Sequence, residues 1–195
     1  MRRIKLFLPM LAMTFGLGNL AQAQIQKGNL MVGGTITDMD FGLKKGQSWG
    51  IGITPKLGYF IKDNLAVGGY VNVDISKQGQ GSTTRTGYGV GAFGRYYANK
   101  EDINNLLKNG RFFFEVNAGL EGANQKGEPT TNGFGFGLGP GYSYFITPNI
   151  GLEALVKYNG LTGGGNEGYQ HDLSFNVGFQ IYLPTSKVKN RLNNL

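Results

Sequence analysis

Cysteine is absent from the sequence, histidine occurs once, and charged residues make up only 16% of the chain. Without cysteine there is no disulfide framework, and one histidine alone is a poor basis for a zinc site. We therefore expect neither a metal nor a cofactor. After the N-terminal leader, no stretch reaches the roughly 18 uninterrupted apolar residues of a membrane helix, so any membrane crossing must use strands.

Glycine and aromatic residues are abundant instead, with 34 Gly, 13 Phe and 10 Tyr in 195 residues. Glycine without a G-X-Y period excludes collagen, and this many aromatic residues exclude a disordered chain. The length suits one domain or two small ones.

The first 23 residues have the composition of a secretory signal peptide. They contain a positive start, an apolar run and a small-x-small cleavage site: Arg2, Arg3 and Lys5, residues 6–17, and Ala21 with Ala23. The alternative, a retained anchor helix, is disfavoured because glycines interrupt a short apolar run. We predict cleavage after residue 23, a folded domain over residues 24–183 and a basic tail over residues 184–195.

The net charge of +7 does not indicate a nucleic-acid-binding protein. The leader carries three positive charges, which leaves +4 for the rest of the chain. Lys187, Lys189 and Arg191 in the tail carry three more, which leaves +1 for the body. No basic face remains for DNA or RNA, so we expect no nucleic-acid partner.

The clearest pattern in the chain is an alternation of apolar with small or polar residues between residues 49 and 73. A period of two indicates strands, and Lys62-Asp63-Asn64 predicts a turn between two of them. Trp49 and Tyr59 bracket the apolar face, ten residues apart. At about 3.4 Å per residue and a tilt of about 45°, this separation spans roughly 24 Å, close to the ~25 Å apolar band of transmembrane barrels.

Similar alternation recurs along the chain and predicts eight strands. They cover residues 28–37, 49–61, 65–76, 86–97, 111–122, 133–146, 150–158 and 170–183. Compact turns near residues 63, 104 and 148 alternate with longer polar loops, and residues 99–110 carry apolar residues at the spacing of a short helical turn. An even strand number with turns at one end and loops at the other predicts an all-β fold, an eight-stranded antiparallel up-and-down transmembrane β-barrel.

Aromatic side chains on the predicted outer faces indicate contact with membrane lipid, because such barrels carry aromatic girdles at both interfaces. The predicted girdle comprises Trp49, Tyr59, Tyr88, Tyr96, Phe112, Phe134, Tyr144 and Tyr158.

The last predicted strand ends in a pattern of polar-x-Gly-x-x-apolar-x-apolar, carried by Asn176, Gly178, Ile181 and Leu183. It resembles the C-terminal assembly signal of the small eight-stranded outer-membrane barrels of the OmpA and OmpX type, and residues 24–183 resemble that family nearly throughout. The usual last aromatic residue is replaced by Leu183, and the tail follows it. The resemblance implies a monomer in the bacterial outer membrane, with both termini in the periplasm, inserted by the barrel-assembly machinery.

Four charged residues fall on predicted inward faces at similar depth: Lys56, Arg95, Glu115 and Glu153. Inward glycines between residues 133 and 146 leave room for long side chains from the neighbouring strands. An eight-stranded barrel is only wide enough to be filled by side chains, so we favour a salt-bridge plug in the lumen over a gate in a narrow pore.

Two further motifs bear on catalysis or binding. Gly89, Gly91 and Gly94 match a dinucleotide fingerprint, but no helix follows to receive a phosphate, and we interpret them as small residues in a crowded wall. His171 precedes Asp172, and some barrels of this size modify lipid A with histidine, serine and acidic residues. Adjacent residues of a strand point to opposite faces, so this pair is disfavoured and we assign no catalytic residue.

The sequence thus favours a non-enzymatic barrel with a structural or surface-interaction role. The alternatives are a narrow porin, a lipid A-modifying enzyme and a soluble lipocalin-like barrel; the aromatic outer faces oppose the last of these.

Overall fold

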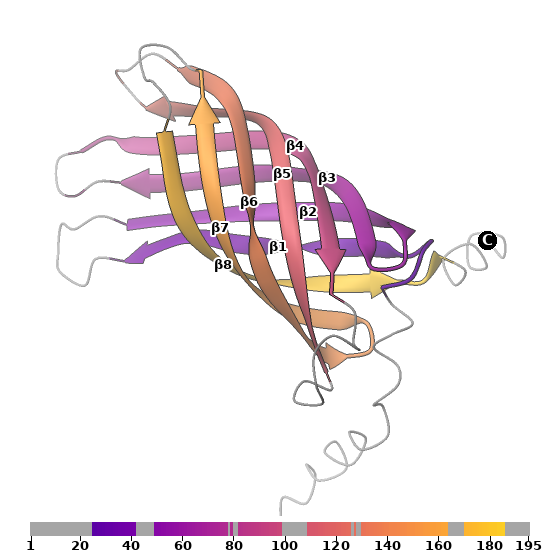
Figure 1. Ribbon diagram of the computed structural model, residues 1–195. Coiled ribbons are helices and arrows are strands. Elements are labelled where there is room, and N and C mark those ends of the chain that lie inside the picture. Colours follow the sequence, from indigo (N-terminus) through magenta and orange to yellow (C-terminus); the bar gives the residue numbers. More distant parts are fainter. Residues whose placement is uncertain are drawn as a thin grey trace, which may run out of the picture.

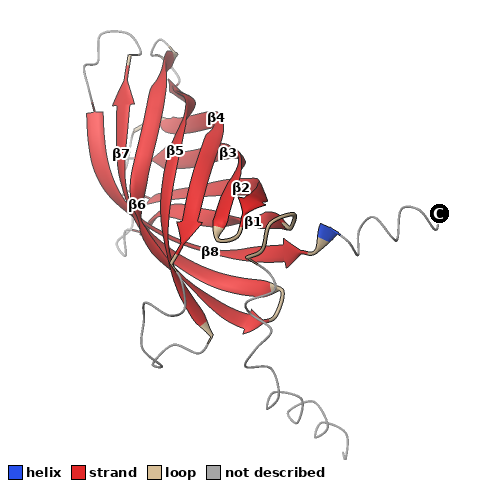
Figure 2. Ribbon diagram, turned by 45° about the vertical axis from the view of Figure 1, so that its right-hand side comes forward, coloured by secondary structure: helices blue, strands red, loops and turns tan. Residues whose placement is uncertain are grey.

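The computed structural model describes residues 25–41, 49–77, 79, 82–98, 109–125, 127, 130–163 and 170–185. Nearly all of this chain is strand (Figure 2). The strands are β1 (Leu30–Phe41), β2 (Trp49–Lys62), β3 (Leu65–Lys77), β4 (Thr84–Tyr97), β5 (Gly110–Gln125), β6 (Thr131–Thr147), β7 (Ile150–Thr162) and β8 (Gln170–Leu183). In this part of the chain no helix is long and apolar enough to cross a membrane.

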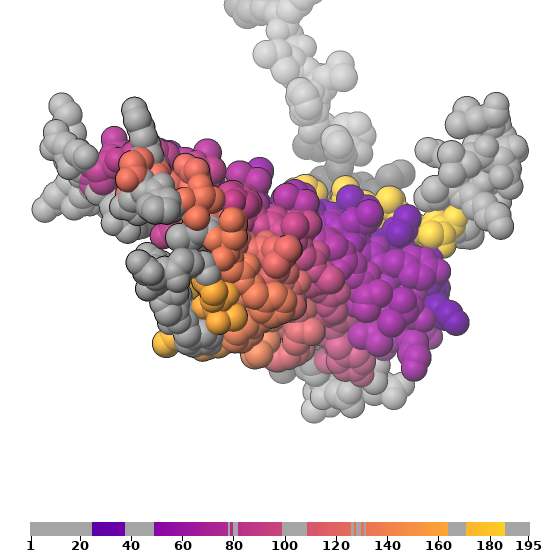
Figure 3. All heavy atoms as spheres, turned by 90° about the horizontal axis from the view of Figure 1, so that it is seen from above, coloured from indigo at the N-terminus to yellow at the C-terminus, as the bar shows by residue number. Residues whose placement is uncertain are grey.

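The eight strands form one closed antiparallel barrel in sequence order (Figure 1). Each strand pairs with the next along the chain, and β8 closes the sheet on β1, with Leu183 opposite Leu30. On the face shown in Figure 3 the colours run from purple through magenta and pink to orange, as expected for neighbouring strands that follow the sequence order. The predicted fold class is confirmed, and closure leaves no free sheet edge.

Side chains alternate between the lumen and the outer surface along every strand. In β2, exposed and buried residues alternate without a break from Trp49 to Phe60. Large apolar residues lie on the outside, with Leu57, Leu120 and Leu173 between 57% and 72% exposed. This is the reverse of a water-soluble protein and matches the lipid-facing surface of a transmembrane barrel.

All eight predicted strands are present, but several are longer than predicted. β1 continues to Phe41 through an irregularity in its pairing with β2 between Thr37 and Asp40, and β7 continues to Thr162. In β7 the added residues, Asn159 to Thr162, include only one large apolar side chain, so hydrophobic alternation gives little signal there, although the backbone ladder continues. The leader and residues 99–108, with their predicted helical turn, lie outside the described residues.

One end of the barrel, the turn end, holds the two shortest connections, residues 63–64 and 148–149. The third connection at this end, residues 98–109 between β4 and β5, is longer than the compact turn predicted near residue 104. Asp63 and Asn64 alone connect β2 to β3, and Asn64 takes a positive φ of 64°, which asparagine tolerates well. The backbone nitrogen of Asn64 donates to the carbonyl of Ile25 at 2.8 Å, and the Thr185 hydroxyl donates to the carbonyl of Gly28. Both ends of the described chain therefore lie at the turn end (Figure 1).

Candidate functional site

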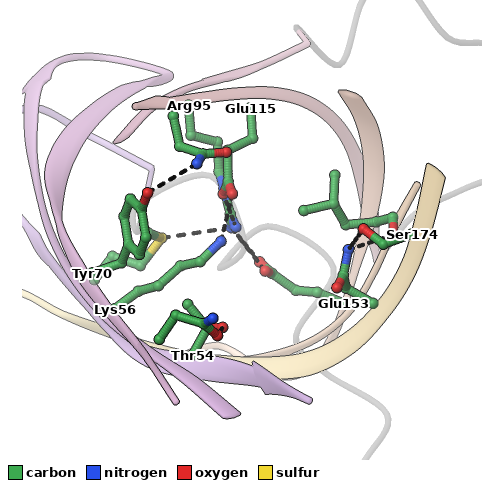
Figure 4. A network of polar contacts seen from close by, with 12 residues as sticks. Thr54, Lys56, Tyr70, Arg95, Glu115, Glu153 and Ser174 are labelled. Carbon is green, nitrogen blue, oxygen red and sulfur yellow. Dashed lines mark hydrogen bonds and ion pairs between the residues drawn. The ribbon is translucent and has the colours of Figure 1, made fainter. Parts of the chain in front are cut away.

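The four charged residues predicted to face inward meet in the lumen, where we call them the ionic layer: Lys56, Arg95, Glu115 and Glu153. They come from β2, β4, β5 and β7 and reach towards the centre of the barrel (Figure 4). Each is 5% exposed or less. Two cations and two anions leave the layer neutral, as a desolvated group of charges requires.

Arg95 is the centre of the ionic layer. It lies directly opposite Glu115 in the register of β4 and β5, and its Nη2 and Nε atoms donate to Glu115 Oε2 at 2.6 and 3.0 Å. Its Nη1 atom donates to both carboxylate oxygens of Glu153, at 2.7 and 2.8 Å. Lys56 binds the other oxygen of Glu115. One guanidinium thus bridges two carboxylates with its fixed fork of donors.

Two tyrosines extend this network. Tyr97 accepts a hydrogen bond from Arg95 Nη1 at 3.0 Å, and its hydroxyl lies 2.8 Å from that of Tyr182. Tyr182 donates to Glu153 Oε1 at 3.1 Å. Neither residue was among the sequence candidates, although both fall on the inward phase of their strands. Their hydroxyl groups complete the hydrogen bonding of charges that water cannot reach.

Below the ionic layer, five rings close the turn end of the lumen, and we call them the aromatic floor: Phe60, Tyr97, Phe113, Phe145 and Tyr182. All are at most 5% exposed. Neighbouring ring centroids lie 5.3 to 6.4 Å apart. The Arg95 guanidinium lies over the Phe113 ring at 4.1 Å, which joins floor and ionic layer by a cation–π contact.

Glycines give these long side chains their space, as the sequence indicated for residues 133–146. A Cβ atom at Gly137 would lie 2.6 Å from Asn117 Oδ1 and 3.2 Å from Lys157 Cδ, and one at Gly135 would collide with the Glu121 carboxylate. The inner face of β6 is therefore a thin wall against which β5 and β7 side chains lie.

Towards the opposite end, the loop end, where each connection has five to seven residues, the lumen opens into a cavity of about 180 Å³, the upper cavity. Its wall includes Asp74, Glu121, Lys157, Asp172, Asn117 and Asn176. Its lining is almost entirely polar, so this half of the lumen is built for water or a polar ligand.

Several buried polar atoms in the described chain have no hydrogen-bond partner. Asn117 Oδ1 and Asn176 Oδ1 belong to side chains that line the upper cavity. Gln180, whose amide has neither donor nor acceptor satisfied, lies nearer the turn end. Unpaired buried acceptors are rare in proteins and call for an explanation.

The predicted girdle residues lie on the outer face. All but Tyr158 are between 39% and 50% exposed: Trp49, Tyr59, Tyr88, Tyr96, Phe112, Phe134 and Tyr144. Tyr158 is half-buried and lies against Phe136 and His171, with ring centroids 6.5 and 6.0 Å away.

The four residues of the proposed assembly signal lie along β8. Asn176 is buried on the lumen side, while Gly178 lies against β1, where an added Cβ would be 2.8 Å from the Thr35 Cα atom. Ile181 and Leu183 pair with Val32 and Leu30 at the closing seam.

The residues weighed for catalysis do not form a site. His171 is exposed on the outer face, while Asp172 lines the upper cavity and accepts from Asn159 Nδ2 at 3.0 Å. Gly89 and Gly91 are wall residues: an added Cβ would lie 3.1 Å from Glu121 Cγ and 2.6 Å from the Tyr70 hydroxyl, respectively. In the described chain no three acidic, histidine or cysteine side chains are grouped to hold a metal ion.

Solved structures similar to this chain are small outer-membrane barrels. Neisserial surface protein A is 18% identical, with 81% of this chain and 97% of that chain covered and a TM-score of 0.55. The N-terminal β-barrel domain of Pseudomonas aeruginosa OprF is 11% identical, with 80% of this chain and 98% of that chain covered and a TM-score of 0.50. Yersinia pestis Ail, the attachment invasion locus protein, is 14% identical, with 81% of this chain and 100% of that chain covered and a TM-score of 0.50.

No protein-family model and no curated protein matches the chain. At these identities the structural likeness shows the fold: this chain has the fold of the small eight-stranded outer-membrane barrels, as the sequence resemblance implied.

Proposed function

We propose that this protein is an integral barrel of the bacterial outer membrane with a non-enzymatic structural or surface-interaction role, and that its lumen is closed. The observation that supports this function most strongly is the closed lower lumen. A neutral, buried ionic layer lies directly on the aromatic floor, and both span the barrel from strand to strand. Side chains that fill an eight-stranded barrel in this way leave no path for a solute.

The outer surface supports the membrane location. Its apolar side chains extend around the wall and its aromatic residues occur towards both ends of the strands, as expected where a barrel meets lipid and interface. Outer-membrane barrels place short turns in the periplasm and longer loops outside. We accordingly propose that the turn end, which holds the two shortest turns and both ends of the described chain, faces the periplasm.

The end of β8 is our candidate for recognition by the barrel-assembly machinery. Ile181 and Leu183 lie at the seam where β8 pairs with β1, the last pairing needed to close the sheet. Recognition of an unpaired β8 before closure would use this apolar end. We propose a monomer, since the closed sheet offers no edge to a second copy.

Channel recordings distinguish this function from a narrow porin. The purified barrel, inserted into planar lipid bilayers, is expected to give no steady unitary conductance, because the ionic layer and the floor block the lumen. Reproducible conductance of the unaltered protein would favour the porin. Mass spectrometry of lipid A from cells that express the protein is the corresponding test for the lipid-modifying alternative, and an unchanged mass is expected.

Surface labelling tests the orientation. Epitope tags inserted at Gly79 or after Gln125, both at the loop end, should be labelled on intact cells. A tag at Asn105, in the connection between β4 and β5, should be labelled only after the outer membrane is permeabilised. If intact cells were labelled at Asn105 alone, the barrel would have the opposite orientation in the membrane.

A further inference from the structure

We propose that the outer wall of the barrel holds a binding site for one anionic phospholipid, with an acyl chain in a groove over β3, β4 and β5 and the headgroup phosphate at Lys77. This inference rests on the membrane location proposed above and adds a specific lipid to it. The groove has a volume of about 590 Å³. Most of its lining comes from outward apolar side chains that are between 41% and 67% exposed: Val71, Val73, Tyr88, Val90 and Leu120.

The groove exists because the side chains on β3 are short and the Tyr88 ring is turned away from them. No outward side chain of β3 between Val67 and Val73 is larger than valine. Tyr88 lies opposite Val73 of β3 and opposite Gly122 of β5. Its hydroxyl donates to Asn132 Oδ1 at 2.7 Å, so the ring crosses Gly122, where an added Cβ would lie 2.7 Å from Tyr88 Cζ. This hydrogen bond holds the ring over β5 and leaves the space beside β3 open.

The position of the groove along the wall suits the acyl chain of a lipid whose headgroup lies at the loop end. Lys77 is on the same outward face of β3 as Val73, four residues nearer the loop end. At about 3.4 Å per residue and a tilt of about 45°, this separation corresponds to roughly 10 Å of membrane depth. The polar region of one leaflet is roughly 5 to 7 Å thick. If Lys77 lies in the headgroup region, the groove is therefore among the acyl chains of the same leaflet, and one lipid can reach both.

The charge of this surface selects the headgroup. Lys77 is half-buried and forms no ion pair within the described chain. Among the residues that the structure describes, no outward position of β3 to β6 holds an acidic side chain. Thr84 and Thr86, both exposed, add hydroxyl groups on the neighbouring strand, with Thr84 opposite Lys77. An ammonium group beside hydroxyl donors binds phosphate. A zwitterionic headgroup is disfavoured, because its own ammonium group finds no carboxylate here.

Trp49 provides a built-in reporter for this site. It is the only tryptophan in the chain and lies directly opposite Lys77 on β2. The barrel in neutral detergent micelles is titrated with phosphatidylglycerol whose acyl chains are brominated, because bromine quenches the fluorescence of a nearby indole. Brominated phosphatidylcholine is titrated in parallel. Saturable quenching is expected, with half-saturation at an about fivefold lower mole fraction of phosphatidylglycerol, the size expected for one lysine at an anionic surface.

Two substitutions separate the headgroup contact from the acyl-chain contact. Lys77→Gln should raise the half-saturation point of phosphatidylglycerol to that of phosphatidylcholine. Val73→Phe fills part of the groove and should weaken both lipids by about fourfold, as expected when roughly one methylene group loses its contact. The matched controls should change neither titration: Lys62→Gln alters an exposed cation at the turn end, and Val116→Phe alters an outward valine away from the groove.

Heat-dependent gel migration reports whether each variant is folded, and the comparison of the two lipids with the wild type needs no variant. The proposal is overturned if both lipids quench the wild type equally, if Lys77→Gln keeps the preference, or if Val73→Phe and Val116→Phe have the same effect. Vesicles made only of brominated phosphatidylcholine test the membrane location separately. Quenching of Trp49 there, without selectivity in micelles, would refute the lipid site alone, whereas no quenching there would refute the membrane location as well.

Discussion

The two halves of the lumen differ in how they satisfy their polar groups. In the lower half, Arg95 alone contacts two carboxylates, a tyrosine hydroxyl and an aromatic ring, and the charges neutralise one another. In the upper half, carboxylates and amides surround an open space. Buried atoms without a hydrogen-bond partner occur in both halves, at Asn117 and Asn176 above and at Gln180 below. The same cylinder of strands is therefore solid at one end and hollow at the other.

The lengths of the inward side chains explain this difference. Towards the turn end the inward positions hold Arg, Lys, Phe, Tyr and Met, which reach the barrel axis. Towards the loop end they hold mainly Thr, Asn, Ser, Asp and Gly, which do not. The length of the inward side chains therefore decides whether the interior is packed or hollow, while the sheet itself is the same in both halves. The following variants test this contrast, from the largest expected effect to the smallest.

Arg95→Ala is expected to cost about 3 to 5 kcal/mol in free energy of unfolding, because it leaves two buried carboxylates without their shared partner. Reversible unfolding in urea, with the protein in lipid vesicles, measures this loss. Arg85→Ala is the matched control: it alters an exposed arginine on the same strand and should change stability by no more than about 0.5 kcal/mol. Equal effects of the two variants would show that Arg95 is solvated.

Val71→Arg and Phe175→Arg are expected to cost about 2 to 4 kcal/mol if these residues lie near the bilayer midplane. Both are on the outer face, 48% and 63% exposed in the absence of lipid. Asn72→Gln, next to Val71 but facing the upper cavity, should cost much less. The same folding measurement in vesicles applies, and a reversed order would mean that the outer and inner faces are exchanged.

Gly68→Ala and Gly69→Ala compare the two faces at one level of β3. An added Cβ at Gly68 would lie 2.6 Å from the Gly58 Cα atom, whereas at Gly69 the nearest atom is the Gly91 carbonyl oxygen at 3.5 Å. Gly68→Ala should therefore cost about 1 to 3 kcal/mol through overpacking, and Gly69→Ala about 0.5 kcal/mol or less. Tolerance of both, measured as urea midpoints, would contradict close packing between β2 and β3 on the lumen side.

Gln180→Met tests whether the lower lumen is dry. Gln180 is fully buried, and neither its Nε2 nor its Oε1 atom has a partner. An apolar side chain of similar shape removes the cost of two unsatisfied groups, so the variant should gain about 1 kcal/mol in unfolding free energy. A loss of similar size would indicate that bound water satisfies Gln180 and that the lower half is also hydrated.

Much of the fold could be predicted from the sequence because the alternation of apolar and polar residues indicates both that a segment is a strand and which of its faces points to lipid. Each inward charge, such as Arg95, has apolar or aromatic neighbours in the sequence that point to lipid, so the strand and its phase are fixed together. All eight strands and the faces of their central residues were predicted correctly. The glycines of β6 also indicated where long side chains would fit.

The remaining features depend on the register between strands that are distant in the sequence and on how far side chains extend into the lumen. Neither can be inferred from a short stretch of sequence. Tyr97 and Tyr182 are 85 positions apart, and only barrel closure brings their hydroxyl groups to 2.8 Å. Their inward phase could have marked them as lumen residues, but not as hydrogen-bond partners of Arg95 and Glu153. The upper cavity could not be predicted from the sequence, because short polar residues on an inward face are equally consistent with the lining of a cavity and with the solvated rim of the barrel.

The coupling between Arg95 and Glu115 is the most direct measure of a closed ionic layer. Unfolding free energies of the wild type, Arg95→Ala, Glu115→Ala and the double variant form a double-mutant cycle. A shared, desolvated layer predicts that the second substitution restores part of the loss caused by the first, with a coupling energy of about 1 to 3 kcal/mol. Additive effects, within about 0.5 kcal/mol, would mean that both side chains are independently solvated, and the closed lumen would be refuted.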